Sequence, residues 1–365
     1  MDYNSIRRKT RSVIVGGVGI GGEYPVSIQS MTNTDTHDKA ATLAQVRRLA
    51  DAGCEIVRLA LPDIEAAKTI AYIKEEGIKI PLVADIHFDY RIALAALDAG
   101  VDKIRINPGN IGSRERTEEV VRACRNKSIP IRIGVNSGSI EKSILAKYSH
   151  ACAEALVESA LSHVRILEEL DFQDIMISVK ASDVMEMIRA NRLLAEACDY
   201  PIHLGVTEAG ARSRALIKSS IGIGTLLAEG IGDTLRVSLT EDPVEEISAA
   251  REILSSLAIG DKRGMDIVSC PTCGRTKIDL INLSLEFENR IKAEGLSDMN
   301  IKVALMGCAV NGPGEAREAD IGIAGGVGEG LLFKKGEIVR KIDEDKLIDE
   351  LIREIKIMRD GEKNG

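Results

Sequence analysis

Short apolar runs alternate with amphipathic stretches along the first two-thirds of the chain. The alternation repeats at intervals of about thirty residues, the length of one strand and one helix. Eight such units predict a (β/α)8 TIM barrel, for which about 250 residues is the usual size. A doubly wound open sheet is the alternative, and the even number of units disfavours it. The expected strands are Tyr24–Met31, Glu55–Leu61, Pro81–His87, Lys103–Pro108, Pro130–Asn136, Asp174–Ala181, Pro201–Glu208 and Thr234–Thr240.

Between these strands, apolar positions recur three and four residues apart, as they do on one face of a helix. A glycine-rich segment, Arg11–Gly22, precedes the first strand and is expected to form a hairpin that plugs the barrel floor. The expected helices are Ala41–Ala52, Ile64–Glu76, Tyr90–Ala99, Glu115–Arg125, Ala151–Leu170, Ala181–Cys198, Ala211–Glu229 and Pro243–Ala258.

A short polar segment with two glycines, residues 259–265, separates the barrel pattern from the rest of the chain. Beyond it we expect a strand, a Cys-x-x-Cys loop, a helix, three more short strands and a charged helix from Asp343. The sequence therefore predicts two domains, a barrel over 1–258 and a small α+β domain over 266–365.

The composition is that of an ordinary globular protein, with 44% hydrophobic and 28% charged residues. A formal net charge of −8 disfavours general binding to nucleic acid or to an anionic membrane. No segment approaches the ~20 apolar residues of a membrane helix. The apolar segment near the start is interrupted by glycines, which disfavours a signal peptide. Seven cysteines, an odd number, indicate a cytoplasmic protein whose cysteines are thiols or metal ligands. Four are expected to be small buried residues: Cys54, Cys124, Cys152 and Cys198.

Charged residues interrupt the expected strands near their carboxyl ends, which form the mouth of such a barrel. Structural ion pairs would explain any one of them. Two like charges ~8 Å apart repel by about 2 kcal/mol at an effective dielectric of ~20, however, and the cations outnumber the carboxylates Asp85 and Glu208. Because arginine's fork matches phosphate oxygens, the mouth is typical of a site for a small phosphorylated ligand. The cations are Arg58, Arg105, Arg132, Lys180 and Arg236.

One glycine motif is set aside. Gly17-Val-Gly-Ile-Gly-Gly22 has the spacing of a dinucleotide-binding loop. That loop must lead directly into a helix, whereas a strand pattern follows here. We therefore expect no nucleotide site in this segment.

Three cysteines near the end of the chain, Cys270, Cys273 and Cys308, are followed by Glu315. A zinc ribbon needs a second Cys-x-x-Cys or a histidine pair, and no histidine follows His203. Three thiolates suit an iron–sulfur cluster that leaves one iron to a weaker ligand. Glu315 is either that ligand or a carboxylate favoured in the first turn of a helix, and spacing alone leaves both open.

The length of the linker bears on the assembly. The last barrel helix, about fifteen residues from Pro243, spans ~22 Å from mouth to floor. The linker after it spans at most ~20 Å. We therefore expect the cysteine domain near the floor of its own barrel, where it would serve the mouth of a partner in a symmetric homodimer.

Four segments together identify a resemblance: Pro130-Ile-Arg-Ile-Gly-Val-Asn-Ser-Gly-Ser, Leu204-Gly-Val-Thr-Glu-Ala-Gly, Ser269-Cys-Pro-Thr-Cys-Gly-Arg-Thr and Met306-Gly-Cys-Ala-Val-Asn-Gly-Pro-Gly-Glu. They closely resemble the 4-hydroxy-3-methylbut-2-enyl diphosphate synthase (GcpE) family of the non-mevalonate isoprenoid pathway. The likeness covers essentially the whole chain. It implies a barrel and a cluster domain that act as a homodimer. The implied reaction is the two-electron ring opening and dehydration of 2-C-methyl-D-erythritol 2,4-cyclodiphosphate.

The resemblance also implies a role for individual residues. The cofactor would be a 4Fe–4S cluster on Cys270, Cys273, Cys308 and Glu315, with flavodoxin or ferredoxin as electron donor. On this interpretation Glu208 is the expected proton donor for the departing hydroxyl, and Asp85 is the second choice. The implied substrate-binding residues are Arg58, His87, Arg105, Asn107, Arg132, Asn136, Lys180, Thr207, Arg236 and Ser238.

Two other functions are compatible with parts of the pattern. One is a zinc-stabilised barrel that acts as a binding protein, which would be colourless and indifferent to air. The other is a cluster enzyme that reduces a different phosphorylated metabolite, which only turnover assays would separate.

Overall fold

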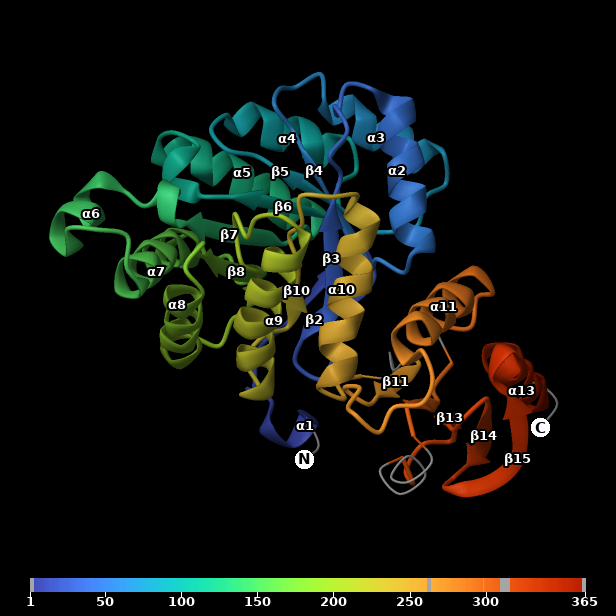
Figure 1. The fold of residues 1–365 in the computed structure, drawn as a ribbon. Coiled ribbons are helices and arrows are strands. Elements are labelled where there is room, and N and C mark those ends of the chain that lie inside the picture. The colour runs from blue at the N-terminus through green and yellow to red at the C-terminus, as the bar shows by residue number, and fades with distance from the viewer. Residues whose placement is uncertain (1–2, 261–263, 298, 309–315, 363–365) are drawn as a thin grey trace. The chain divides into compact units, whose positions relative to one another are not determined.

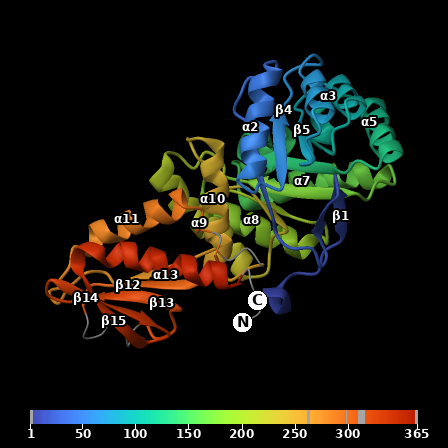
Figure 2. The same cartoon turned by 90° about the vertical axis from the view of Figure 1, so that its right-hand side faces the viewer.

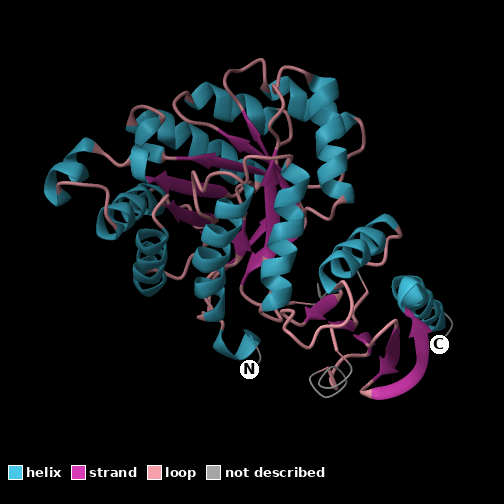
Figure 3. Ribbon diagram, in the orientation of Figure 1, coloured by secondary structure: helices cyan, strands magenta, loops and turns pink. Residues whose placement is uncertain are grey.

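A computed structural model of the chain describes residues 3–260, 264–297, 299–308 and 316–362. The chain forms two compact units, Met1–Gly260 and Asp261–Gly365 (Figure 1). Helices surround strands in the first unit, and the second contains a mixed sheet with helices (Figure 3). None of the helices in the described ranges has the length and apolar character needed to cross a membrane.

The first unit is a (β/α)8 barrel, as the sequence predicts. Its parallel strands are neighbours in the order β8-β7-β6-β5-β4-β3-β10-β9. A bridge between Ile177 and Ile202 links the two ends of this order, so the sheet closes on itself. Each predicted strand is present, although shorter than the apolar run that predicts it. The strands are β3 (Ser27–Met31), β4 (Ile56–Ala60), β5 (Leu82–Asp85), β6 (Lys103–Ile106), β7 (Ile131–Asn136), β8 (Ile175–Lys180), β9 (His203–Leu204) and β10 (Thr234–Leu235).

Amphipathic helices lie outside the ring of strands (Figure 2). Four of them begin at an aspartate whose carboxylate accepts a backbone N–H from the first turn, which stabilises the helix start. The sequence analysis missed the short helices α1 (Tyr3–Ile6) and α6 (Lys142–Tyr148) and the turns η1 (Pro108–Asn110) and η2 (Ser137–Ser139). The long helices are α2 (Lys39–Asp51), α3 (Ala67–Glu75), α4 (Tyr90–Asp98), α5 (Arg114–Lys127), α7 (Ala153–Glu169), α8 (Val184–Ala197), α9 (Arg212–Ala228) and α10 (Pro243–Ser256).

The predicted hairpin closes the barrel floor. Strands β1 (Ser12–Val15) and β2 (Val18–Gly21) pair antiparallel, and the turn between them uses glycines with positive φ. Val15 and Ile20 are fully buried in a cluster with side chains from β4, β5 and β8. The glycine motif therefore lies in a hairpin and leads into no helix, which confirms that it is no dinucleotide-binding loop.

The second unit is a five-stranded sheet with helices. Strands β11 (Asp266–Ser269), β12 (Lys302–Met306) and β13 (Ile321–Gly325) are parallel, and β14 (Glu329–Lys334) and β15 (Glu337–Asp343) continue the sheet antiparallel. Three short strands follow the predicted helix and strand, where the sequence analysis predicted two. Helices α11 (Leu280–Ala293) and α13 (Leu347–Glu362), with the turn η3 (Glu344–Lys346), complete the unit.

Helices α11 and α13 pack together over the sheet. Phe287 of α11 and Ile355 of α13 are fully buried in one apolar cluster with Val303 and Ile321 from the middle strands. Because β11, β12 and β13 run in parallel, their carboxyl ends meet at one edge of the sheet. The residues that follow these three strands are thereby brought side by side.

Candidate active site

An ionic network at the mouth of the barrel centres on Asp85, at the end of β5. Its carboxylate lies 3.2 Å from Arg105 Nη1, 3.8 Å from Arg58 Nε and 3.6 Å from His87 Nε2. Burial alone would raise the pKa of Asp85, but Arg58, His87 and Arg105 together hold that pKa well below its usual range. The carboxylate is therefore ionised at neutral pH and fixes two arginines in place.

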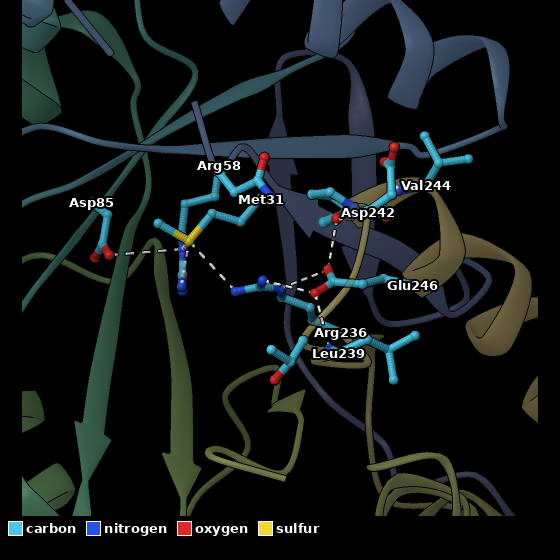
Figure 4. Close-up of polar contacts among 12 residues, drawn as sticks. Met31, Arg58, Asp85, Arg236, Leu239, Asp242, Val244 and Glu246 are labelled. Carbon is cyan, nitrogen blue, oxygen red and sulfur yellow. Dashed lines mark hydrogen bonds and ion pairs between the residues drawn. The ribbon is translucent and has the colours of Figure 1, made fainter. Parts of the chain in front are cut away.

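A second network holds Arg236, which follows β10. Glu246 of α10 accepts from both Nε and Nη2 of this arginine, each at 3.0 Å, and from Ser30 Oγ at 2.7 Å (Figure 4). The Met31 sulfur lies 2.9 Å from Arg58 Nη2 and 3.4 Å from Arg236 Nη1, between the two guanidinium groups. The sequence analysis missed Glu246, because an acid in the first turn of a helix usually only stabilises the helix.

Two of the five predicted cations, Arg132 and Lys180, have no carboxylate partner among the described residues. Arg132 has 0% exposure, and its Nε and Nη1 atoms make no hydrogen bond. Burial lowers the pKa of Lys180 well below its usual value, and Arg132 and Arg58 lower it further. A buried, unpaired guanidinium is costly to keep, so this arrangement is typical of a site that binds an anion.

Glycines on the neighbouring strands make room for these cations. A Cβ atom on Gly134 of β7 would lie 2.3 Å from Arg105 Nε. A Cβ atom on Gly205, after β9, would lie 2.7 Å from Lys180 Nζ. Any side chain at either position would displace the cation, so the space at the mouth depends on both glycines.

The remaining predicted residues also lie at the carboxyl ends of the strands. Asn107 is buried and accepts the Gly134 N–H at 3.1 Å, and Asn136 caps η2. Thr207 and Ser238 are half-buried. Glu208 is exposed, has a left-handed φ of 52° and makes no ion pair within the described ranges. A side chain held in that backbone conformation indicates local strain of the kind found at functional sites.

The cysteine edge of the second unit is the set formed by Cys270, after β11, and Cys308, after β12. Register pairs Ser269 with Leu305, so the two cysteines leave adjacent parallel strands at the same edge. The Gly307 N–H donates to Cys270 Sγ at 3.2 Å. A cysteine sulfur binds a metal ion as the thiolate.

Cys273 lies in the loop between β11 and α11 and is exposed. Its N–H donates to Thr276 Oγ1 at 3.0 Å, and hydrogen bonds from the backbone and side chain of Arg275 lower the pKa of its thiol. Across the described part of the chain, no three His, Cys, Asp or Glu side chains gather closely enough to hold a metal ion. Glu315 lies outside the described residues. The chemistry of these thiols fits a metal centre, and the ligand set stays a prediction.

The other cysteines are structural. Cys54, Cys124 and Cys152 are buried and Cys198 is half-buried, as expected of small apolar side chains. Burial raises the pKa of Cys54 and Cys124 to about 12, so both remain thiols.

Fold and sites together define a two-unit protein with a cation-rich TIM barrel and a small cysteine-bearing unit. The GcpE TIM-barrel domain matches residues 10–251, and the GcpE protein C-terminal domain matches residues 266–357. The chain therefore belongs to the GcpE family.

Curated relatives match almost the whole chain. A protein of Clostridium acetobutylicum is 60% identical over 96% of this chain and 99% of its own length, and one of Clostridium perfringens is 61% identical over the same shares. A Bacillus subtilis relative is 57% identical over 96% of this chain and 92% of its own length. All three are named 4-hydroxy-3-methylbut-2-en-1-yl diphosphate synthase (flavodoxin).

Among solved structures, type I 3-dehydroquinate dehydratase of Clostridium difficile is similar to the barrel. It covers 68% of this chain and 97% of its own, with a TM-score of 0.50 and 17% sequence identity. At this identity the likeness concerns the fold alone.

Proposed function

We propose that this chain catalyses the reaction for which its relatives are named, the formation of 4-hydroxy-3-methylbut-2-en-1-yl diphosphate from 2-C-methyl-D-erythritol 2,4-cyclodiphosphate. Two electrons and two protons enter, the ring carbon–oxygen bond breaks, and one water leaves. The observation that carries this proposal is the buried guanidinium of Arg132, which, like the Lys180 amine, has no carboxylate partner among the described residues, because a cyclic diphosphate supplies the missing negative charge.

The mouth would bind and orient this substrate. Asp85 and Glu246 fix Arg58, Arg105 and Arg236 before any ligand arrives. These side chains therefore lose little conformational freedom when the substrate binds. Arg132 then contributes an unpaired positive charge, and the Lys180 amine a further hydrogen-bond donor, for the diphosphate. His87, Asn107, Asn136, Thr207 and Ser238 supply hydrogen-bonding groups at the same ends of the strands.

Glu208 is the proposed proton donor for the departing hydroxyl. A proton donor must be protonated when it acts, and Asp85 is held ionised by Arg58, Arg105 and a hydrogen bond from His87. This argument supports Glu208 over Asp85. The exposure of Glu208 and its lack of an ion partner within the described ranges leave it free to exchange protons with water.

Cys270, Cys273 and Cys308, with Glu315, are the proposed holders of a 4Fe–4S cluster. When bound, such a cluster supplies single electrons and a Lewis-acidic iron. The lowered pKa of Cys273 supports a thiolate ligand in this loop, and the Gly307 N–H contacts the Cys270 sulfur after β11. The relatives' names support flavodoxin as the electron donor. All seven cysteines are free, which supports a reducing compartment such as the cytoplasm.

The proposed assembly is a homodimer in which the cysteine unit of one chain serves the mouth of the other. The support is the short linker after α10, which limits the reach of the second unit. Mixing a Cys308→Ser protein with an Arg132→Met protein tests this arrangement after subunit exchange. Recovery of activity in the mixture supports the dimer, and a mixture as inactive as its components refutes it.

The function itself is tested by turnover. The protein is purified without oxygen and given the cyclodiphosphate with reduced flavodoxin. The proposal expects the linear diphosphate as product and brown, air-sensitive protein. A colourless zinc protein that binds the cyclodiphosphate and leaves it unchanged would refute the proposal.

A further inference from the structure

A buried amine lies inside the barrel beneath the mouth. Lys103 and Arg105 are two residues apart on β6, so both point inward and Lys103 lies deeper. Lys103 has 0% exposure. The only hydrogen-bond contact of its Nζ atom within the described ranges is the Met176 sulfur of β8, at 3.6 Å. Neither the mouth networks nor the proposed reaction uses this residue.

Among the residues that the structure describes, none brings a negative charge against Lys103. The charged groups that act on it are Arg132 of β7 and Arg58 of β4. His203 of β9 is also fully buried, has no hydrogen-bond partner on either ring nitrogen, and is faced by Arg132, Lys180, Lys103 and Arg58. The mouth carboxylates Asp85 and Glu246 are already engaged by arginines.

Burial, followed by the two arginines, lowers the pKa of Lys103 well below its usual value. The pKa of His203 is lowered well below its usual value by the same causes. Burial of this kind favours the neutral form of the base when the site is empty. An anion near it raises the pKa again, so the base takes up a proton when the anion binds.

We propose that Lys103 is a charge-matching residue, neutral in the free protein, that becomes an ammonium group when a diphosphate occupies the mouth. Lys103 is the acceptor rather than His203 because an amine holds a proton about 10⁴-fold more tightly than an imidazole does. One negative charge ~7 Å away, at an effective dielectric of ~20, raises the proton affinity of such a base by about fiftyfold.

This inference rests on the proposed function for its purpose. The cyclic diphosphate carries one ionised oxygen on each phosphorus, whereas ring opening creates a terminal phosphate with a second ionisation near pH 6. The ligand therefore gains negative charge during the reaction. A proton held on Lys103 offsets the added negative charge of the ligand. It does so from inside the barrel, where no solvent ion reaches.

Calorimetry of cyclodiphosphate binding without reductant tests the proposal. Binding heats are measured from pH 6 to pH 9 in two non-phosphate buffers with different ionisation enthalpies, which gives the number of protons taken up. The bound cyclodiphosphate does not titrate in this range, so any uptake belongs to the protein. We expect about one proton per bound molecule, shared between Lys103 and the mouth lysine Lys180.

The Lys103→Met variant separates the two lysines. Methionine replaces a buried amine by an apolar chain of similar length beside Met176, so the barrel is expected to fold with an unchanged or higher unfolding temperature. Proton uptake should fall by about half or more, while the cyclodiphosphate still binds. The matched control is Lys127→Met, at the exposed end of α5, which should behave as the wild type.

The possible outcomes are distinct. Wild-type heats that are the same in both buffers overturn the proposal without any variant, and so does full uptake in Lys103→Met. Either result leaves the proposed function intact if the protein still turns over. A protein that fails to bind the cyclodiphosphate overturns this inference and the assignment of the mouth together.

Discussion

In the barrel mouth Arg105 and Arg236 are each fixed by a carboxylate from another element, whereas Cys270 and Cys273 rely on a few nearby backbone and side-chain groups. Arg236 is held by both oxygens of Glu246, and Arg105 by Asp85. Cys270 receives one N–H, from Gly307, and Cys273 is exposed. The difference indicates that the mouth is organised before its ligand binds, whereas the edge would acquire its final arrangement from the proposed cluster. The following changes, from the largest expected effect to the smallest, test this contrast.

Cys308→Ser should lower the turnover rate at least a thousandfold, because a serine hydroxyl is a poor ligand for iron. Binding of the cyclodiphosphate to the barrel should be unchanged, since the two sites are built separately. Cys198→Ser is the control, because Cys198 is half-buried beside α8. This variant protein should keep its colour and activity. Loss of cyclodiphosphate binding in Cys308→Ser would show that the mouth depends on the edge for its structure.

Glu208→Gln should lower kcat by about 10³-fold with little change in KM, because only the proton transfer is lost. The pH dependence of kcat near neutral pH should have the same shape in Asp85→Asn as in the wild type, since the pKa of Asp85 is already held well below its usual range. Full turnover by Glu208→Gln would remove Glu208 from the reaction.

Arg132→Met should weaken kcat/KM by about a hundredfold, the size of a lost charge-assisted contact. The stability of the ligand-free variant should stay the same or rise. Without ligand, thermal unfolding should occur at the same or a higher temperature, because a buried guanidinium with two unpartnered nitrogens has been removed. Strong destabilisation of the free protein would mean that Arg132 serves the fold rather than the ligand.

Gly134→Ala should destabilise the barrel by about 1–3 kcal/mol and raise KM, since the new Cβ meets Arg105 Nε at 2.3 Å. Denaturant unfolding and steady-state kinetics measure the two effects. Gly138→Ala is the matched control a few residues further on, because a Cβ there has no atom within 4 Å. Equal behaviour of the two variants would show that Arg105 moves aside at no cost.

The sequence predicts much of the barrel mouth because its residues break a simple pattern. Arg58, Arg105 and Arg132 interrupt apolar strands, and a buried strand does not tolerate a charge without a reason. Glu246 was not predictable, since its role follows from the packing of α10 against β3. Lys103 was overlooked because it begins a strand, where a lysine usually reaches solvent.

The cysteine edge shows the opposite balance. Its thiols are easily found in the sequence, because a Cys-x-x-Cys pair followed by a third cysteine is rare. Their mutual arrangement depends on turns after β11 and β12, and neither hydrophobic periodicity nor spacing determines it. The fifth strand, β15, was also missed, since most of its residues are exposed and it lacks a buried alternation.

The most direct measurement joins the two regions in one experiment. Protein purified without oxygen is reduced with a slight excess of electrons, which bleaches its visible absorbance, and is then mixed with the cyclodiphosphate. We predict that the absorbance returns as the linear diphosphate forms, because electrons leave the cysteine edge for a ligand bound in a barrel mouth. Absorbance that stays bleached while the cyclodiphosphate binds unchanged would contradict the account.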